Sequence, residues 1–192
     1  MGVDRREQRS VCRTRALMAA GFGVGALLQA GLVWAGPLVG TGAFKWATSS
    51  QVRAMIAKDS GTARGSTVTY SGPVAHVVVV VPQPEFPFPK FDIDHLRNPT
   101  LVLPAGATIK FTFINKINNF SHSFQITRAR PPFAMFPKIE PVLVGTELSP
   151  ASGTGNDAFA NFSWHPSAGH YYYLCAIPGH AKMGMFGSII VR

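Results

Sequence analysis

The side chains best suited to chemistry in this 192-residue chain gather in one short segment near its end, YYYLCAIPGHAKMGMFG. Cys175, His180 and Met185 follow one another there with the spacing Cys-x4-His-x4-Met. Thiol, imidazole and thioether groups are ligands of soft and borderline transition metals. The spacing therefore indicates a metal site built largely on one loop.

A further ligand has to come from elsewhere, and the strand-like run SHSFQITR offers His122. Cys175 is predicted at the end of a strand, where a turn at Pro178-Gly179 folds the chain back so that His180 and Met185 face the sulfur. Two imidazoles and a thiolate with a weak axial thioether select copper and are typical of an electron-transfer centre. The sequence predicts one copper held by His122, Cys175, His180 and Met185.

Ordinary structural roles compete with this interpretation for each residue taken alone. A single cysteine among apolar residues is more often an inert part of the core, and isolated histidines and methionines are more often structural than ligands. The combination of spacing, turn and upstream histidine is what favours copper. The other histidines show no comparable arrangement and are interpreted as structural or exposed: His76, His95, His165 and His170.

Short strands are predicted to position these residues. Runs rich in β-branched and aromatic residues, from STVTYS to GSIIVR, are separated by Pro, Gly, Asn or Ser, a pattern that indicates an antiparallel sandwich or barrel. The segment from Ala129 to Asp157, rich in Pro and Gly, is predicted to be an extended surface loop. One helix is predicted from Ser49 to Gly61, capped by Ser49 or Ser50. Its apolar face is formed by Val52, Met55 and Ile56.

Composition and charge exclude other classes of protein. Hydrophobic residues make up 46% of the chain and charged residues 14%, which describes a folded domain rather than a disordered chain. The formal net charge of +9 invites a nucleic-acid interpretation, but no Lys/Arg run occurs outside the N-terminus. Nucleic-acid binding is therefore not predicted.

The N-terminus has the features of an export signal. Arginines cluster between Arg5 and Arg15, ahead of an uncharged stretch from Ala16 to Ala35 that ends in small residues. Residues 1–35 are predicted to be a signal cleaved after Ala35, and a retained membrane anchor is the alternative. Cleavage removes Cys12, and an exported chain with one unpaired cysteine needs a use for it other than a disulfide.

Residues from about Phe44 to Arg192 resemble the cupredoxins, and among them the larger blue copper proteins of acidophilic iron-oxidising bacteria. The resemblance is carried by FKWATSSQVRAMIAKDSG, PAGATIKFTFIN, SHSFQIT, PPFAMFP and FSWHPSAGHYYYLCAIPGHAKMGMFGSIIV. It implies an all-β, Greek-key β-sandwich over residues 36–192, with an N-terminal extension that contains one short helix. It also implies one type 1 copper, with the family's ligands on His122, Cys175, His180 and Met185.

The resemblance further implies a periplasmic one-electron carrier that is not an enzyme. Its partners would be redox proteins, namely an iron-oxidising cytochrome and a downstream cytochrome c or oxidase. The protein is expected to be a monomer, with membrane contact only if the N-terminal segment is retained. An apolar patch around the loop would suit brief encounters with a partner; it is predicted from Ala176, Ile177, Pro178, Met183, Phe186 and the segment Pro131 to Pro137.

Other copper proteins fit less well. Enzymes that pass electrons to a second copper place histidines beside the ligand cysteine, whereas Leu174 and Ala176 flank Cys175. A binuclear thiolate centre needs two cysteines, and zinc prefers a harder ligand than methionine. A copper chaperone or copper-storage protein is the alternative, because such proteins also use Met and His, usually at exposed and flexible sites.

Overall fold

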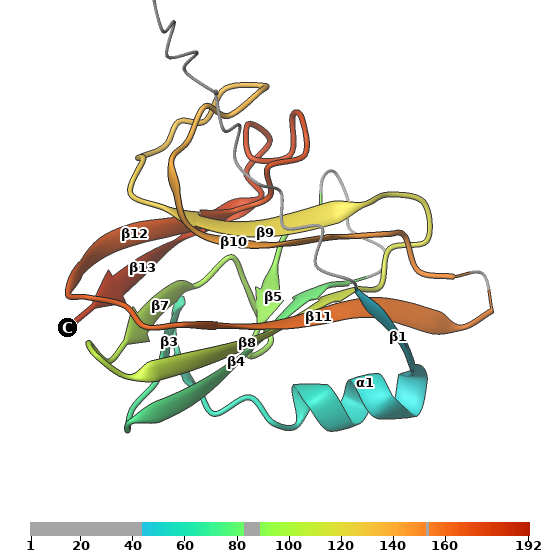
Figure 1. Ribbon diagram of the computed structural model, residues 1–192, viewed down its shortest axis with the longest axis horizontal. Helices are drawn as coiled ribbons and strands as arrows, with labels where there is room; N and C mark the ends of the chain where they lie inside the picture. Colours follow the sequence, from blue (N-terminus) through green and yellow to red (C-terminus); the bar gives the residue numbers. More distant parts are fainter. Residues whose placement is uncertain (1–43, 83–88, 153) are drawn as a thin grey trace, which may run out of the picture. The chain divides into compact units, whose positions relative to one another are not determined.

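The computed structural model describes residues 44–82, 89–152 and 154–192, and the predicted export signal at residues 1–35 lies outside these ranges. The described residues form a β-sandwich of two sheets with one helix, α1 (Ser49–Ile56), against the outer face of one sheet (Figure 1). This confirms the predicted all-β sandwich with one short helix. Among the described residues, no helix has the length and apolar character needed to cross a membrane.

The two sheets differ in size and share no strand. The smaller sheet has the order β1-β11-β8-β4-β5-β6: β1 (Lys45–Thr48), β11 (Asn156–Trp164), β8 (Thr108–Asn115), β4 (Val74–Val81), β5 (Asp92–Ile93) and β6 (Leu96–Arg97). The larger sheet has the order β10-β9-β12-β13-β7-β3-β2: β10 (Pro141–Leu148), β9 (His122–Thr127), β12 (Gly169–Leu174), β13 (Phe186–Val191), β7 (Thr100–Leu103), β3 (Thr67–Thr69) and β2 (Thr62–Arg64).

The sheets are mixed, whereas the sequence predicted antiparallel pairing. β4 runs parallel to β8, and β7 runs parallel to both β13 and β3. Consecutive strands from β7 to β9 alternate between the two sheets instead of forming hairpins. The strands of each parallel pair are therefore distant in sequence, and their direction is set by the crossovers.

The valine run of β4 is buried on both faces. Val77 and Val79 belong to the core between the sheets, and Val78 and Val80 pack on the helix side with Val52 of α1. The sequence of a strand that is covered on both faces is a continuous apolar run, without the alternation of apolar and polar residues seen in a half-exposed strand. The helix of the N-terminal extension is what covers the outer face of β4.

The helix is shorter than predicted, and its cap lies one residue earlier. Thr48 is the N-cap: its Oγ1 accepts a hydrogen bond from the Gln51 N–H at 3.4 Å, and the Gln51 side chain accepts from the Thr48 N–H at 2.8 Å. This reciprocal capping box satisfies two amides at the start of the helix. The chain leaves the helix at Ala57, so the predicted continuation to Gly61 is wrong.

The prediction of one extended loop from Ala129 to Asp157 is wrong. Strand β10 lies within this segment and pairs with β9. The glycine that argued against a strand is required by the packing. A Cβ on Gly145 would lie 2.5 Å from the carbonyl oxygen of Phe124. Close approach of two backbones is a common reason for glycine inside a strand.

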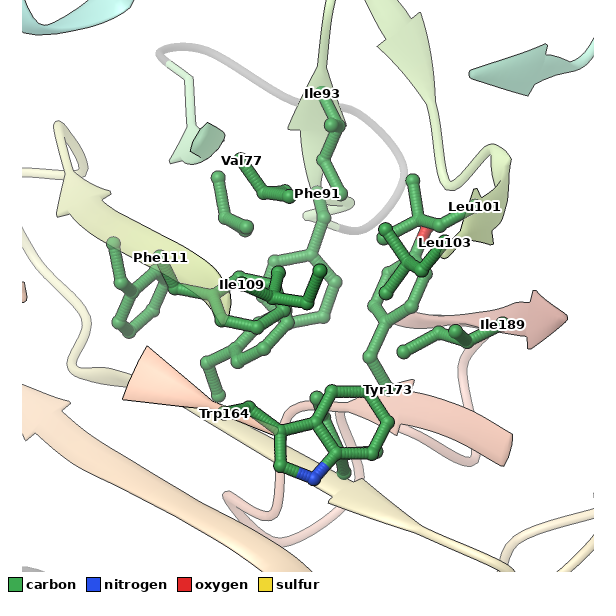
Figure 2. Packing of buried hydrophobic residues seen from close by; sticks show 14 of the residues in the cluster. Val77, Phe91, Ile93, Leu101, Leu103, Ile109, Phe111, Trp164, Tyr173 and Ile189 are labelled. Carbon is green, nitrogen blue, oxygen red and sulfur yellow. The ribbon is translucent and has the colours of Figure 1, made fainter. Parts of the chain in front are cut away.

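Large buried side chains fill the space between the sheets. Figure 2 shows Phe91, Ile109, Trp164 and Tyr173 converging there from different strands and loops. The ring of Phe91 lies 5.6 Å from that of Tyr173, and the Tyr173 hydroxyl donates to the carbonyl of Pro99 at 2.7 Å. A core packed in this way resists deformation, and β12, which carries Tyr173, leads directly to Cys175.

Candidate metal centre

The predicted ligands lie at the ends of neighbouring strands of the larger sheet. His122 is the first residue of β9, and Cys175 directly follows β12, which pairs with β9. His180 lies in the connection from β12 to β13, and Met185 is the residue before β13. Strand pairing therefore brings together residues that are far apart in the sequence.

The structure brings His122, Cys175 and His180 into one cluster whose nitrogen and sulfur atoms all lie within 4.8 Å of one another. The Cys175 Sγ lies 3.9 Å from the Nδ1 of His122 and 3.4 Å from the Nδ1 of His180. The centroids of the two imidazole rings are 4.9 Å apart. It is the one such cluster that the described part of the chain contains.

Burial differs sharply among the four side chains. His122, Cys175 and Met185 have 0% of their surface exposed, whereas His180 is only partly buried. Met185 belongs to the same apolar core as Cys175. Three of the four side chains are therefore shielded from solvent, and only the imidazole of His180 reaches it.

Ser123 supports the sulfur, and the sequence analysis missed it. Its backbone N–H donates to the Cys175 Sγ at 3.4 Å, and its Oγ lies 3.8 Å from the same atom. The Ser123 Oγ also accepts the N–H of Ala176 at 2.8 Å. Donors to sulfur favour the thiolate, and the position of Ser123 directly after His122 was the available signal.

Hydrogen bonds hold the loop that carries His180 and Met185. The Cys175 N–H donates to the Met185 carbonyl at 3.1 Å, and the Met185 N–H donates to the His180 carbonyl at 3.0 Å. The side-chain amide of Asn98 donates to the carbonyl of Gly184 at 2.6 Å. Asn98 lies 86 residues earlier, and no local pattern in the sequence indicated it.

The segment before His122 is organised by one buried amide, that of Asn115. Its Nδ2 donates to the carbonyls of Phe120 and Ser149 at 2.9 Å each, and its Oδ1 accepts the N–H of Ile117 at 3.0 Å. Three hydrogen bonds from one buried side chain fix the turn that leads into β9.

Burial favours the neutral forms of the ligand groups in the metal-free protein. Burial, assisted by the charge of His180, lowers the pKa of His122 to about 3, and burial also lowers the pKa of His180. Burial raises the pKa of the Cys175 thiol to about 11, although hydrogen bonds from Ser123 and Ile177 oppose this change. A bound cation favours the thiolate, so metal uptake releases a proton from this sulfur.

The predicted apolar patch is divided between surface and core. Phe136 and Met135 are 69% and 45% exposed, Met183 is 36% exposed, and Pro178 is also exposed. Phe133, in contrast, is buried and packs edge-on against Phe186 at 5.2 Å. We use the name apolar rim for four exposed residues of this patch, Met135, Phe136, Pro178 and Met183.

The sequence is similar to known proteins over most of the described residues. The sulfocyanin (SoxE) domain family matches residues 77–192. Rusticyanin from Acidithiobacillus ferrooxidans is 54% identical over 151 residues, which covers 79% of this chain and 97% of that protein. The chain belongs to the rusticyanin family. Rusticyanin from Acidithiobacillus ferridurans is 49% identical over 175 residues, 91% of this chain and 92% of that protein.

Solved structures of rusticyanin have the same fold. The structure from Thiobacillus ferrooxidans is 52% identical and matches with a TM-score of 0.74, covering 78% of this chain and 97% of its own. A structure of reduced rusticyanin is 48% identical and matches with a TM-score of 0.75, covering 78% and 100%. Rusticyanins are copper proteins, and the cluster of His122, Cys175 and His180 could bind one copper. Membership of the rusticyanin family supports a role as a blue copper electron carrier.

Proposed function

We propose that the protein carries single electrons through one type 1 copper bound by His122, Cys175, His180 and Met185. The observation that carries this proposal is the cluster of one ring nitrogen from each of two histidines and one sulfur, all within 4.8 Å of one another and mostly buried. The donor set fits copper, because two imidazoles, a thiolate and a thioether select it over harder metals. When bound, copper supplies a one-electron couple between Cu(II) and Cu(I).

The chain's own contribution is to hold these ligands still. Ser123 fixes the sulfur, Asn98 fixes the loop before Met185, and paired strands fix His122. Ligands that move little between oxidation states keep the reorganisation cost of electron transfer low. Burial of three ligands argues against a chaperone, which has to release its copper.

His180 and the apolar rim form the proposed contact surface for redox partners. His180 is the one partly exposed ligand, and the rim residues Met135 and Met183 both lie close to Gly179, the residue before it. A small apolar surface suits brief encounters in which electrons pass at short range. We propose that the partners are cytochromes, with which the protein interacts as a monomer.

The resemblance to proteins of iron-oxidising bacteria supports a finer proposal. We infer that the carrier works in the periplasm, after cleavage of residues 1–35, between an iron-oxidising cytochrome and a downstream cytochrome c or oxidase. Rapid-mixing measurements of electron exchange with purified cytochromes c test the partner. The absence of exchange with any cytochrome would contradict this step without affecting the copper assignment.

The optical spectrum tests the proposed function directly. The protein reconstituted with one equivalent of Cu(II) should show an intense blue absorption that ferrous iron or ascorbate removes and an oxidant restores. The expected stoichiometry is one electron per chain. A colourless protein that binds only Cu(I) would instead indicate a chaperone or storage role.

The two methionines of the loop are expected to affect the reduction potential differently. Met185→Leu should raise the potential, because removing the axial thioether destabilises Cu(II) relative to Cu(I). Met183→Leu should change it little, because Met183 lies on the surface. Potentiometric titration of both variants measures the difference. A larger change for Met183→Leu would show that the axial ligand is misassigned.

A further inference from the structure

Copper has to reach a centre whose ligands are mostly out of contact with solvent. His122, Cys175 and Met185 are fully buried, and His180 is the partly exposed member of the set. An incoming ion therefore meets His180 before the other three ligands. The surroundings of His180 decide how the ion is first held.

Two exposed methionines lie beside Gly179, the residue before this histidine. A Cβ on Gly179 would lie 3.0 Å from the Sδ of Met135 and 3.6 Å from the Cε of Met183, so both side chains reach the same point. The Gly179 N–H donates to the Met135 carbonyl at 2.7 Å, and the Met183 N–H donates to the Gly179 carbonyl at 2.9 Å. Their backbones are thus fixed around Gly179, while 45% of Met135 and 36% of Met183 is exposed.

The backbone conformation at position 179 favours glycine. Gly179 has a φ of +86°, which residues with a side chain rarely adopt. A Cβ at this position would also make a close contact with the sulfur of Met135. In Figure 1 the chain between β9 and β10, which contains Met135, and the red β12–β13 connection project to the same side of the sheets. Because Gly179 has no side chain, both methionine side chains can lie close to the backbone directly before His180.

Thioethers in this position have a definite ligand preference. They are soft donors that select Cu(I) over Cu(II) and over harder divalent ions. A methionine side chain has three rotatable bonds, so two of them can close around an ion and release it again. Neither thioether takes up a proton, which keeps both available in acid, where exposed imidazoles are charged.

We propose that Met135 and Met183 form a surface site that captures Cu(I) and passes it over Gly179 to His180 and the buried ligands. The proposal rests on the proposed copper centre. The oxidation state does not change: bonds from the two thioethers are exchanged for bonds to His122, Cys175 and His180. The S–H bond of Cys175 breaks in this exchange, and its proton passes to water.

Binding is tested on protein whose buried centre is already filled with Cu(I). One further equivalent of Cu(I), added anaerobically as its acetonitrile complex, should shift the methyl signals of Met135 and Met183 in protein labelled at the methionine methyl groups. The methyl of Met55, on α1, should not move and serves as the internal control. Unchanged signals from both rim methionines would overturn the proposal.

Uptake kinetics test the transfer. Metal-free protein is mixed with a coloured Cu(I) chelate, and the rate of decolorisation is measured for the unaltered chain and for the double variant Met135→Leu/Met183→Leu. Leucine keeps the surface apolar, so any change in rate reports the loss of the two thioether sulfurs and not a loss of apolar surface. We expect the double variant to load at least about tenfold more slowly, as is typical when residues that support a metal site are removed. Met55→Leu is the matched control and should load at the unaltered rate.

The outcomes separate this proposal from the copper centre itself. Slower Cu(I) uptake by the double variant, with Cu(II) uptake at the unaltered rate, supports capture by the thioethers. Equal Cu(I) rates in a protein that turns blue would overturn the surface site and leave the buried centre intact. A chain that takes up copper in neither oxidation state would overturn both proposals.

Discussion

Cys175→Ser is expected to abolish the blue colour completely. The intense absorption of a type 1 centre arises from charge transfer between a thiolate sulfur and Cu(II), and a serine oxygen cannot supply it. Cys175 is the sulfur that faces both Nδ1 atoms, at 3.9 Å from His122 and 3.4 Å from His180. Visible absorption and electron paramagnetic resonance of the Cu(II)-loaded variant measure the loss.

The chain offers a matched control in its other cysteine. Cys12→Ser in the full-length protein changes the same functional group outside the described sandwich and should leave the blue band intact. Circular dichroism of Cys175→Ser should show that the fold persists, because serine is smaller and the core around it is otherwise unchanged. An intensely blue Cys175→Ser protein would refute the assignment of the ligand sulfur.

Much of the centre could be predicted because its ligands follow local rules. The spacing of Cys175, His180 and Met185 reflects one strand, one turn and the next strand. His122 could be identified only in combination with this loop, because His76 and His170 also lie in strands and are interpreted as structural or exposed. The sequence thus predicted the three residues that the structure clusters, and the assignment of all four as ligands stays a prediction for the spectra above.

The parts that could not be predicted depend on contacts between distant segments. Asn98 reaches the loop from 86 residues away, and nothing in its own neighbourhood reveals that contact. Gly145 argued for a loop locally but serves a strand whose backbone packs on Phe124. The helix cap is a different case, because it is local: Thr48 and Gln51 fit the capping-box pattern Thr-x-x-Gln, which the sequence analysis missed.

Acid should separate the copper-loaded protein from the metal-free protein. In the metal-free chain, burial holds the pKa of His122 near 3 against 6.5 for an exposed imidazole. The folded state therefore binds fewer protons than the unfolded chain between these values, and stability falls as the pH falls from 6.5 to 3. The loss for His122 amounts to at most about 5 kcal/mol, and His180, whose pKa is also lowered by burial, changes stability in the same direction.

Carboxylates oppose this loss. Burial raises the pKa of Asp59, which accepts the N–H of Val78 at 2.7 Å, so the folded state holds its proton more tightly and gains stability as the pH falls toward 3.8. Burial also raises the pKa of Asp157. With nine acidic residues in the whole chain, little stability depends on ionised carboxylates. The histidines are therefore the main acid-sensitive groups of the metal-free fold.

Copper removes that sensitivity, because a histidine bound to metal cannot take up a proton until the metal leaves. Binding to the folded state alone also adds stability by mass action. We expect the copper-loaded protein to keep its fold and colour near pH 2–3, and the metal-free protein to unfold at a clearly higher pH. Parallel pH titrations followed by visible absorption and circular dichroism measure both midpoints, with the exposed His170→Gln variant as a control that should keep the difference. Equal midpoints with and without copper would show that protonation of His122 and His180 does not control acid unfolding. Blocking these two histidines with the metal would then leave the acid stability unchanged.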